Sequence, residues 1–196
     1  MKSIEKFNIF YSDEVIKNFY AGINSGNKFV ILSGATGTGK TLLGILYPAA
    51  RNKRLSEIAE NCDDEIELKD EIMKEEYICF IRIQPNWTTP KDIIGYYNPI
   101  KGEFIKGQLY DFLIKANKNP YKEFFLILDE MNLSHPEHYL SDILSAMETK
   151  GVINIHNSDE IKNVEKNIPF PKNLSIIGTI NIDETTKELS PRLKSR

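Results

Sequence analysis

A glycine-rich run with one lysine carries the clearest chemical signal in the sequence. It fits the pattern G-x-x-x-x-G-K-[ST] and consists of Gly34, Ala35, Thr36, Gly37, Thr38, Gly39, Lys40 and Thr41, with Leu42 next. Glycines let such a loop wrap a phosphate with its backbone N–H groups pointing inward, and a following helix adds partial positive charge. Lys40 would contact the β- and γ-phosphates, and the Thr41 hydroxyl would ligate Mg²⁺. The run therefore predicts a binding site for a nucleoside triphosphate.

Two carboxylates at the end of an apolar run can supply the metal and water chemistry for such a ligand. Asp129 and Glu130 directly follow residues 124–128, and open α/β sheets bind ligands at the carboxyl ends of their strands. We expect Asp129 to hold Mg²⁺, directly or through water, and Glu130 to orient or deprotonate the attacking water. Asn181 ends another apolar run, and its amide is expected to help position that water. The alternatives are an acidic pair that caps a core strand and a turn-forming asparagine.

Short apolar runs rich in β-branched side chains predict the strands that must position these groups. They cover residues 28–33, 77–83, 124–128 and 174–180. Helical patterns lie between them, and strands separated by helices indicate an open parallel α/β sheet with right-handed crossovers. The sequence shows no internal repeat and no linker, so we expect one domain over 1–196.

Several helices carry start or stop signals. Ser12 precedes a helical pattern as a cap, and Ser134 with Glu137 three positions later forms a capping-box pattern before another helix. In the helix after the phosphate loop, Pro48 predicts a kink or an early end near Leu46.

The connection after the second strand departs from the helical pattern. Residues 95–107 form short alternating pieces around Asn98-Pro99 and Lys101-Gly102, which predicts a β-hairpin inserted into a helical connection. A second irregular stretch covers 152–171.

Composition and charge narrow the class of protein. The 196 residues hold 25 Lys and Arg against 28 Asp and Glu, a formal net charge of −3, with 41% hydrophobic residues. This profile is typical of a globular protein and excludes collagen-like, disulfide-dense and disordered classes. The longest apolar run, 124–128, is far shorter than the roughly 20 residues of a membrane helix. We therefore expect a cytoplasmic protein with no membrane partner.

The charge is unevenly distributed. Residues 55–76 contain ten Asp and Glu against two Lys, a local charge of −8, so the remainder carries +5. We interpret the acidic block as a solvated helix face or a mobile loop. The modestly basic remainder permits nucleic-acid contact without requiring it.

The cysteines and histidines carry little signal. Cys79 lies in an apolar run and is expected to be a small core side chain, whereas Cys62 among acidic residues is expected to be incidental. His135, His138 and His156 lack metal-ligand spacing, and we expect the first two to be surface or capping residues.

In this order, the phosphate loop, the Asp-Glu strand end and the strand-terminal Asn resemble the AAA+ ATPases over most of the chain. More narrowly, residues 84–97, 129–132 and 170–181 look like the McrB-type branch, whose members are motor subunits of 5-methylcytosine-dependent restriction systems. The MoxR-type ATPases are close relatives. The hairpin with Tyr96 and Tyr97 is similar to the helix-2 insert of that clade, which points toward the central pore of a ring.

The resemblance implies an AAA+ large α/β subdomain in a homo-oligomeric ring, a hexamer in the full-length protein, with nucleotide sites between subunits. Arg196 matches best the arginine that completes the neighbour's site, with Arg192 second. A solvated basic helix is the alternative for both. The family continues into a fifth strand and a helical lid, which implies a truncated subdomain with weak or no turnover by itself. A nuclease subunit and DNA are the implied partners.

Several functions stay open at this point. The leading one is Mg²⁺-dependent hydrolysis of ATP or GTP by a McrB-like motor; the branch prefers GTP, but residues 180–185 depart from its motif. A MoxR-like chaperone ATPase that remodels proteins is the alternative. A small-molecule kinase is disfavoured by Glu130 beside Asp129, and a nucleotide-binding scaffold without hydrolysis is the last candidate.

Overall fold

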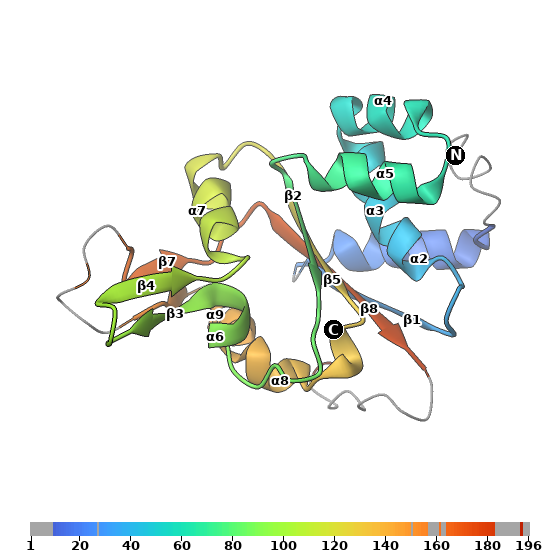
Figure 1. Ribbon diagram of the computed structural model, residues 1–196. Coiled ribbons are helices and arrows are strands. Elements are labelled where there is room, and N and C mark those ends of the chain that lie inside the picture. Colours follow the sequence, from blue (N-terminus) through green and yellow to red (C-terminus); the bar gives the residue numbers. More distant parts are fainter. Residues whose placement is uncertain are drawn as a thin grey trace.

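Four parallel strands form the centre of the molecule (Figure 1). The computed structural model describes residues 10–26, 28–149, 151–156, 161, 164–182 and 193. The strand order is β1-β8-β5-β2, and all three pairings are parallel. The strands are β1 (Phe29–Gly34), β2 (Ile78–Arg82), β5 (Phe124–Asp129) and β8 (Leu174–Asn181). The predicted parallel α/β fold is confirmed, with each strand near its predicted range.

Helices cover both faces of this sheet. In Figure 1, one layer holds α2 (Asp13–Ile23), α3 (Lys40–Arg51), α4 (Lys53–Asn61) and α5 (Glu65–Met73). The other holds α6 (Lys91–Ile94), α7 (Tyr110–Lys118), α8 (Pro136–Tyr139) and α9 (Ser141–Thr149). Successive side chains of a strand alternate between faces, so Phe125 and Ile127 pack toward the first layer while Leu126 and Leu128 pack toward the second. This explains why β5 is apolar at every position before Asp129.

The helix after the phosphate loop is longer than expected. α3 continues through Pro48 to Arg51, so the predicted early end near Leu46 is wrong. Leu42, Ile45, Leu46 and Ala49 are all buried in one apolar cluster. The burial of this face offsets the roughly 3 kcal/mol that an interior proline costs a helix.

The predicted caps have different outcomes. Ser12 accepts a hydrogen bond from the backbone N–H of Val15 at 3.3 Å, which confirms the cap of α2. The capping box at Ser134 is wrong, because this hydroxyl donates to the Trp87 carbonyl and His135 takes the cap position of α8. A tertiary contact has replaced the local one.

The acidic block forms a pair of helices, α4 and α5, whose charged sides face solvent. This confirms the expected solvated helix face. Cys62 between them is buried in the core, and its interpretation as functionally incidental stays a prediction. Cys79 packs against the other core cluster as predicted, and burial raises the pKa of its thiol to about 12.

Two small hairpins lie side by side at the end of the molecule away from α2–α5 (Figure 1). The first, β3 (Gly95–Asn98) with β4 (Glu103–Lys106), confirms the predicted insertion. The second, β6 (Val152–Asn154) with β7 (Asn167–Pro169), was expected only as an irregular stretch. Each of its strands has three residues, which is too short for alternation to be read in sequence.

Candidate functional site

A polar cavity opens at the carboxyl edge of the sheet. Its volume is about 220 Å³. The parallel register places Gly34 of β1 beside Asn181 of β8, and Arg82 of β2 beside Asp129 of β5, so four strand ends meet there. The lining residues are Thr36, Gly37, Gly39, Lys40, Thr41, Glu65, Arg82, Asp129, Glu130, Thr179 and Asn181. Five of the predicted loop residues thus share one cavity with Asp129, Glu130 and Asn181, whereas Gly34, Ala35, Thr38 and Leu42 are not among its lining residues.

The phosphate loop depends on glycine for its backbone conformation. Gly37 and Gly39 have φ angles of +79° and +77°, in the left-handed region that glycine adopts without steric cost. A Cβ atom at Gly37 would meet nothing within 4 Å, so conformation and not space requires glycine there. Gly39 ends the loop and Lys40 begins α3, which places the positive end of a helix at the cavity.

Lys40 lies folded back against its own loop. Its Nζ donates to the carbonyls of Gly34 at 3.0 Å and Ala35 at 2.6 Å. Burial lowers the pKa of Lys40, and the negative charges of Asp129 and Glu130 oppose that shift. In the described part of the chain no carboxylate forms an ion pair with it. The ammonium group is therefore available to an anionic ligand in the cavity.

Two oxygen donors suitable for a divalent cation are adjacent. The Thr41 hydroxyl donates to Asp129 Oδ1 at 2.7 Å, and Asp129 is only 5% exposed. Mg²⁺ prefers a few hard oxygen ligands completed by water and substrate phosphates over an all-protein cage. Across the described ranges, no group of three or more His, Cys, Asp or Glu could hold a metal. Thr41 and Asp129 thus fit Mg²⁺ bound together with a phosphate ligand.

Glu130 is held by donors from two other strands. Its Oε2 lies 3.2 Å from Arg82 Nε, and its Oε1 accepts from Asn181 Nδ2 at 3.4 Å. The residue has φ +53°, which is uncommon for a side chain other than glycine, Asn or Asp. The strand stops at this turn and the carboxylate reaches the cavity beside Asn181.

Thr179 is a buried residue that connects Asp129 and Glu130, and the sequence analysis did not predict it. Its hydroxyl donates to Asp129 Oδ1 at 2.9 Å and accepts from the Glu130 backbone N–H at 3.0 Å. It is 2% exposed. One side chain therefore orients both members of the acidic pair, and only the register of β8 against β5 reveals it.

Two further site residues were missed. Asn132 and Asn181 form a reciprocal pair: Asn132 Nδ2 donates to the Asn181 carbonyl at 2.9 Å, and the Asn181 N–H donates to Asn132 Oδ1 at 3.3 Å. Arg82 ends β2 and pairs with Glu130. The signal for Asn132 was its place two residues after the acidic pair, and that for Arg82 was a charge ending an apolar run.

Other predicted residues lie elsewhere. Leu42 is fully buried beneath the loop and supports it through the core. Tyr96 and Tyr97 lie on β3 of the β3–β4 hairpin and are not among the residues that line the cavity. Arg192 and Arg196 fall outside the described residues. His135 and His138 are exposed, as expected.

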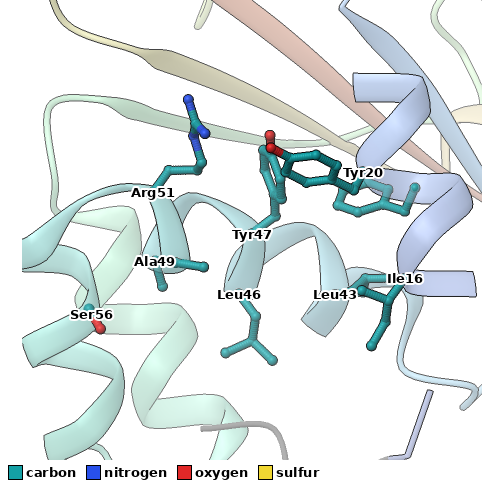
Figure 2. Close-up of a pocket in the computed structure, with 10 residues that line it drawn as sticks. Ile16, Tyr20, Leu43, Leu46, Tyr47, Ala49, Arg51 and Ser56 are labelled. Atoms are coloured by element: carbon teal, nitrogen blue, oxygen red, sulfur yellow. The ribbon is translucent and has the colours of Figure 1, made fainter. Parts of the chain in front are cut away.

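A larger cavity between α2 and α3 offers different chemistry. Its volume is about 360 Å³, and Figure 2 shows Ile16, Leu43 and Leu46 among its lining residues. The guanidinium of Arg51 there is paired with Glu123 at 2.7 Å. The lining of this cavity is mostly apolar, unlike that of the cavity at the sheet edge, which holds the phosphate loop and the acidic pair.

Comparison with known proteins supports the fold. No protein-family model matches the chain, and no curated protein matches it. Among solved structures, the chain is similar to the crystal structure of "a putative ATPase" from Cytophaga hutchinsonii, with a TM-score of 0.51 and 19% identity. The match covers 100% of this chain and 46% of that one, so the chain spans less than half the length of that protein. The comparison thus supports the α/β architecture of the chain, which that protein shares.

Within the described ranges, no helix combines the length and the apolar character needed to cross a bilayer.

Proposed function

We propose that this chain binds a Mg²⁺-nucleoside triphosphate and contributes the groups that hydrolyse its terminal phosphate. The observation that carries the proposal is the hydrogen bond of 2.7 Å between Thr41 and Asp129 in the cavity that also holds Lys40 and Glu130. It joins the phosphate loop to the acidic strand end at the place where a metal–phosphate ligand requires both. The name of the similar solved structure, an ATPase, agrees with this function.

Each group has a role that follows from its chemistry. The loop N–H groups and Lys40 would bind the phosphates, with Lys40 exchanging its two loop carbonyls for phosphate oxygens. Thr41 and Asp129 would hold Mg²⁺, which neutralises charge on the phosphates when bound. Glu130 would orient a water molecule and accept its proton.

Positioning of Glu130 would depend on its neighbours. Asn181 donates to one carboxylate oxygen, and the other contacts Arg82. The ion pair with the guanidinium would hold the carboxylate in place at the end of β5. Thr179 accepts from the backbone N–H of Glu130, and Asn132 holds the backbone of Asn181 through two hydrogen bonds.

We further propose that the chain is the nucleotide-binding part of a ring-forming motor of the McrB-like AAA+ branch, acting in the cytoplasm with a nuclease subunit and DNA. The motif runs and the β3–β4 hairpin support this assignment. In such a ring, Arg196 or Arg192 of a neighbouring copy would complete each site. Weak or absent turnover by the chain alone follows from that requirement.

A MoxR-like remodelling ATPase is the second candidate. Ile100, at the turn of the β3–β4 hairpin, is 95% exposed, and an apolar hairpin tip suits contact with a polypeptide. DNA binding that weakens with salt would favour the restriction motor. Salt-insensitive binding of an unfolded polypeptide would favour the remodelling ATPase.

Calorimetric titration of the chain with ATP·Mg²⁺ and GTP·Mg²⁺ tests the proposal. We expect binding of at least one nucleotide, and a loss of about tenfold or more in Lys40→Ala, because a charged hydrogen bond is removed. A preference for GTP would favour the restriction motor, and one for ATP the broader AAA+ function. Equal binding by the wild type and a folded Lys40→Ala variant would contradict the proposed site.

A further inference from the structure

An acidic side chain that the proposed hydrolysis leaves unused lines the phosphate cavity. Glu65 is the first residue of α5, directly after its cap Asp64, and it lines the cavity together with Thr36 and Gly37. It comes from the acidic pair of helices, whereas Asp129 and Asn181 come from strand ends. The cavity is therefore lined both by residues at the carboxyl edge of the sheet and by a residue of the helical layer that holds α2–α5.

The position of Glu65 is unexpected for a site that binds phosphate. A carboxylate repels phosphate oxygens, and in its ionised form it can only accept hydrogen bonds. Within the described residues no Lys or Arg forms an ion pair with Glu65. Its charge is therefore not neutralised by a local cation, and its oxygens are free to accept hydrogen bonds from a ligand group that donates them.

Glu65 lies near a tyrosine that contacts the phosphate loop. Burial raises the pKa of Tyr11 to about 12, and the charge of Glu65 adds to this rise, which places these two side chains near each other. Tyr11 donates from its hydroxyl to the Gly39 carbonyl at 2.7 Å, where the loop joins α3. Tyr11 thus contacts the loop where α3 begins, and the charge of Glu65 lies near this contact.

We propose that Glu65 recognises the nucleoside part of the triphosphate ligand by accepting hydrogen bonds from ribose hydroxyls or base N–H groups. This inference rests on the proposed function of the same cavity. A nucleoside triphosphate offers donors only on its sugar and base, since its phosphate oxygens are acceptors. A carboxylate beside a phosphate loop is therefore matched to the nucleoside end, as the acidic residue of dinucleotide-binding folds is matched to ribose.

The proposal separates two effects of removing the carboxylate. Loss of negative charge alone would strengthen binding of every triphosphate, including inorganic tripolyphosphate. Loss of hydrogen bonds to the nucleoside would weaken binding of ATP and GTP only. Because a hydrogen bond to a charged group is involved, we expect a loss of about tenfold in nucleotide affinity.

The test is calorimetric titration of the full chain and its Glu65→Ala variant with Mg²⁺ complexes of ATP, GTP, 2′-deoxy-ATP and tripolyphosphate. The matched control is Asp70→Ala, which removes the same charge from an exposed position of α5 outside the cavity lining. Thermal unfolding of each variant checks the fold, and Glu65 itself is exposed. We expect Glu65→Ala to bind ATP or GTP about tenfold more weakly, to bind tripolyphosphate as well as or better than the wild type, and Asp70→Ala to bind both normally.

The affinities of Glu65→Ala for the different ligands show which part of the nucleotide contacts Glu65. An unchanged affinity for 2′-deoxy-ATP in Glu65→Ala, with a loss for ATP, would assign the contact to the 2′-hydroxyl. A loss for only one of ATP and GTP would assign it to the base. Equal or tighter binding of nucleotides by Glu65→Ala, while Lys40→Ala still loses binding, would overturn this inference alone. If the wild type binds neither nucleotides nor tripolyphosphate, the proposed function fails and this inference fails with it.

Discussion

The sheet edge and the hairpin end of the molecule are held together in different ways. At the edge, polar groups have several partners each: Asp129 accepts from Thr41 and Thr179, and Asn181 exchanges hydrogen bonds with Asn132. Between the hairpins, the ring of Phe104 lies 6.2 Å from that of His156. Buried His156 Nδ1 has no hydrogen-bond partner among the described residues.

This difference matters for what each region can do. Groups locked by reciprocal hydrogen bonds keep their geometry, as electrostatic catalysis requires. A contact made mainly by the side-chain rings of Phe104 and His156 is less directional than a hydrogen bond. It leaves the two hairpins free to adjust to a partner. We therefore expect substitutions at the edge to affect chemistry and stability strongly, and those between the hairpins to affect stability weakly.

The largest effect is expected from Glu130→Gln. The amide keeps the size of the side chain but cannot accept the water proton, so the rate of hydrolysis should fall by about 10²–10⁴-fold. Nucleotide affinity should stay close to that of the wild type, because Lys40 and the loop remain. Because the chain alone is expected to hydrolyse weakly, the hydrolysis rate is measured by single turnover in the assembled ring and the affinity by calorimetry. An unchanged hydrolysis rate in the ring would remove Glu130 from the proposed role.

An intermediate effect is expected from Thr179→Val, which keeps the shape of the side chain and removes its hydroxyl. The Glu130 N–H loses its acceptor and Asp129 loses one donor, so the free energy of unfolding should fall by about 1–3 kcal/mol. Urea denaturation measures this change. Thr149→Val, at an exposed position of α9, is the matched control and should change stability little; equal losses in both variants would refute the special role of Thr179.

The smallest effect is expected at the hairpins. His156→Phe removes a buried nitrogen that has no partner within the described residues, along with the 3.3 Å contact of Nε2 with the Val164 carbonyl. Removing the unpartnered nitrogen should stabilise the fold, whereas losing the Nε2 contact should destabilise it. The two effects oppose each other, so the free energy of unfolding should change by less than about 1 kcal/mol. A loss as large as that of Thr179→Val in the same urea experiment would show that the hairpin contact is as specific as the sheet edge.

The sequence was most informative where function and local structure coincide. A phosphate loop must follow a strand and begin a helix, so residues 34–41 predicted β1 and α3 as well as a ligand. The roles of Glu130 and Asn181 in hydrolysis stay predictions, although the structure brings both into one cavity.

The missed features depend on contacts between distant segments. Thr179 and Arg82 enter the site through strand register, which no local pattern specifies. Ser134 was expected to cap a helix, but the Trp87 carbonyl competes for its hydroxyl. The β6–β7 hairpin is too short to show alternation.

The left-handed backbone at Glu130 has an evolutionary consequence. An ordinary side chain in that conformation costs about 1–2 kcal/mol relative to glycine. Selection for the carboxylate therefore acts against selection for a stable fold at this one position. In a descendant that no longer needed hydrolysis, this residue would be expected to drift toward glycine or asparagine. A glycine after the strand-ending aspartate would then mark a copy of the fold retained for binding alone.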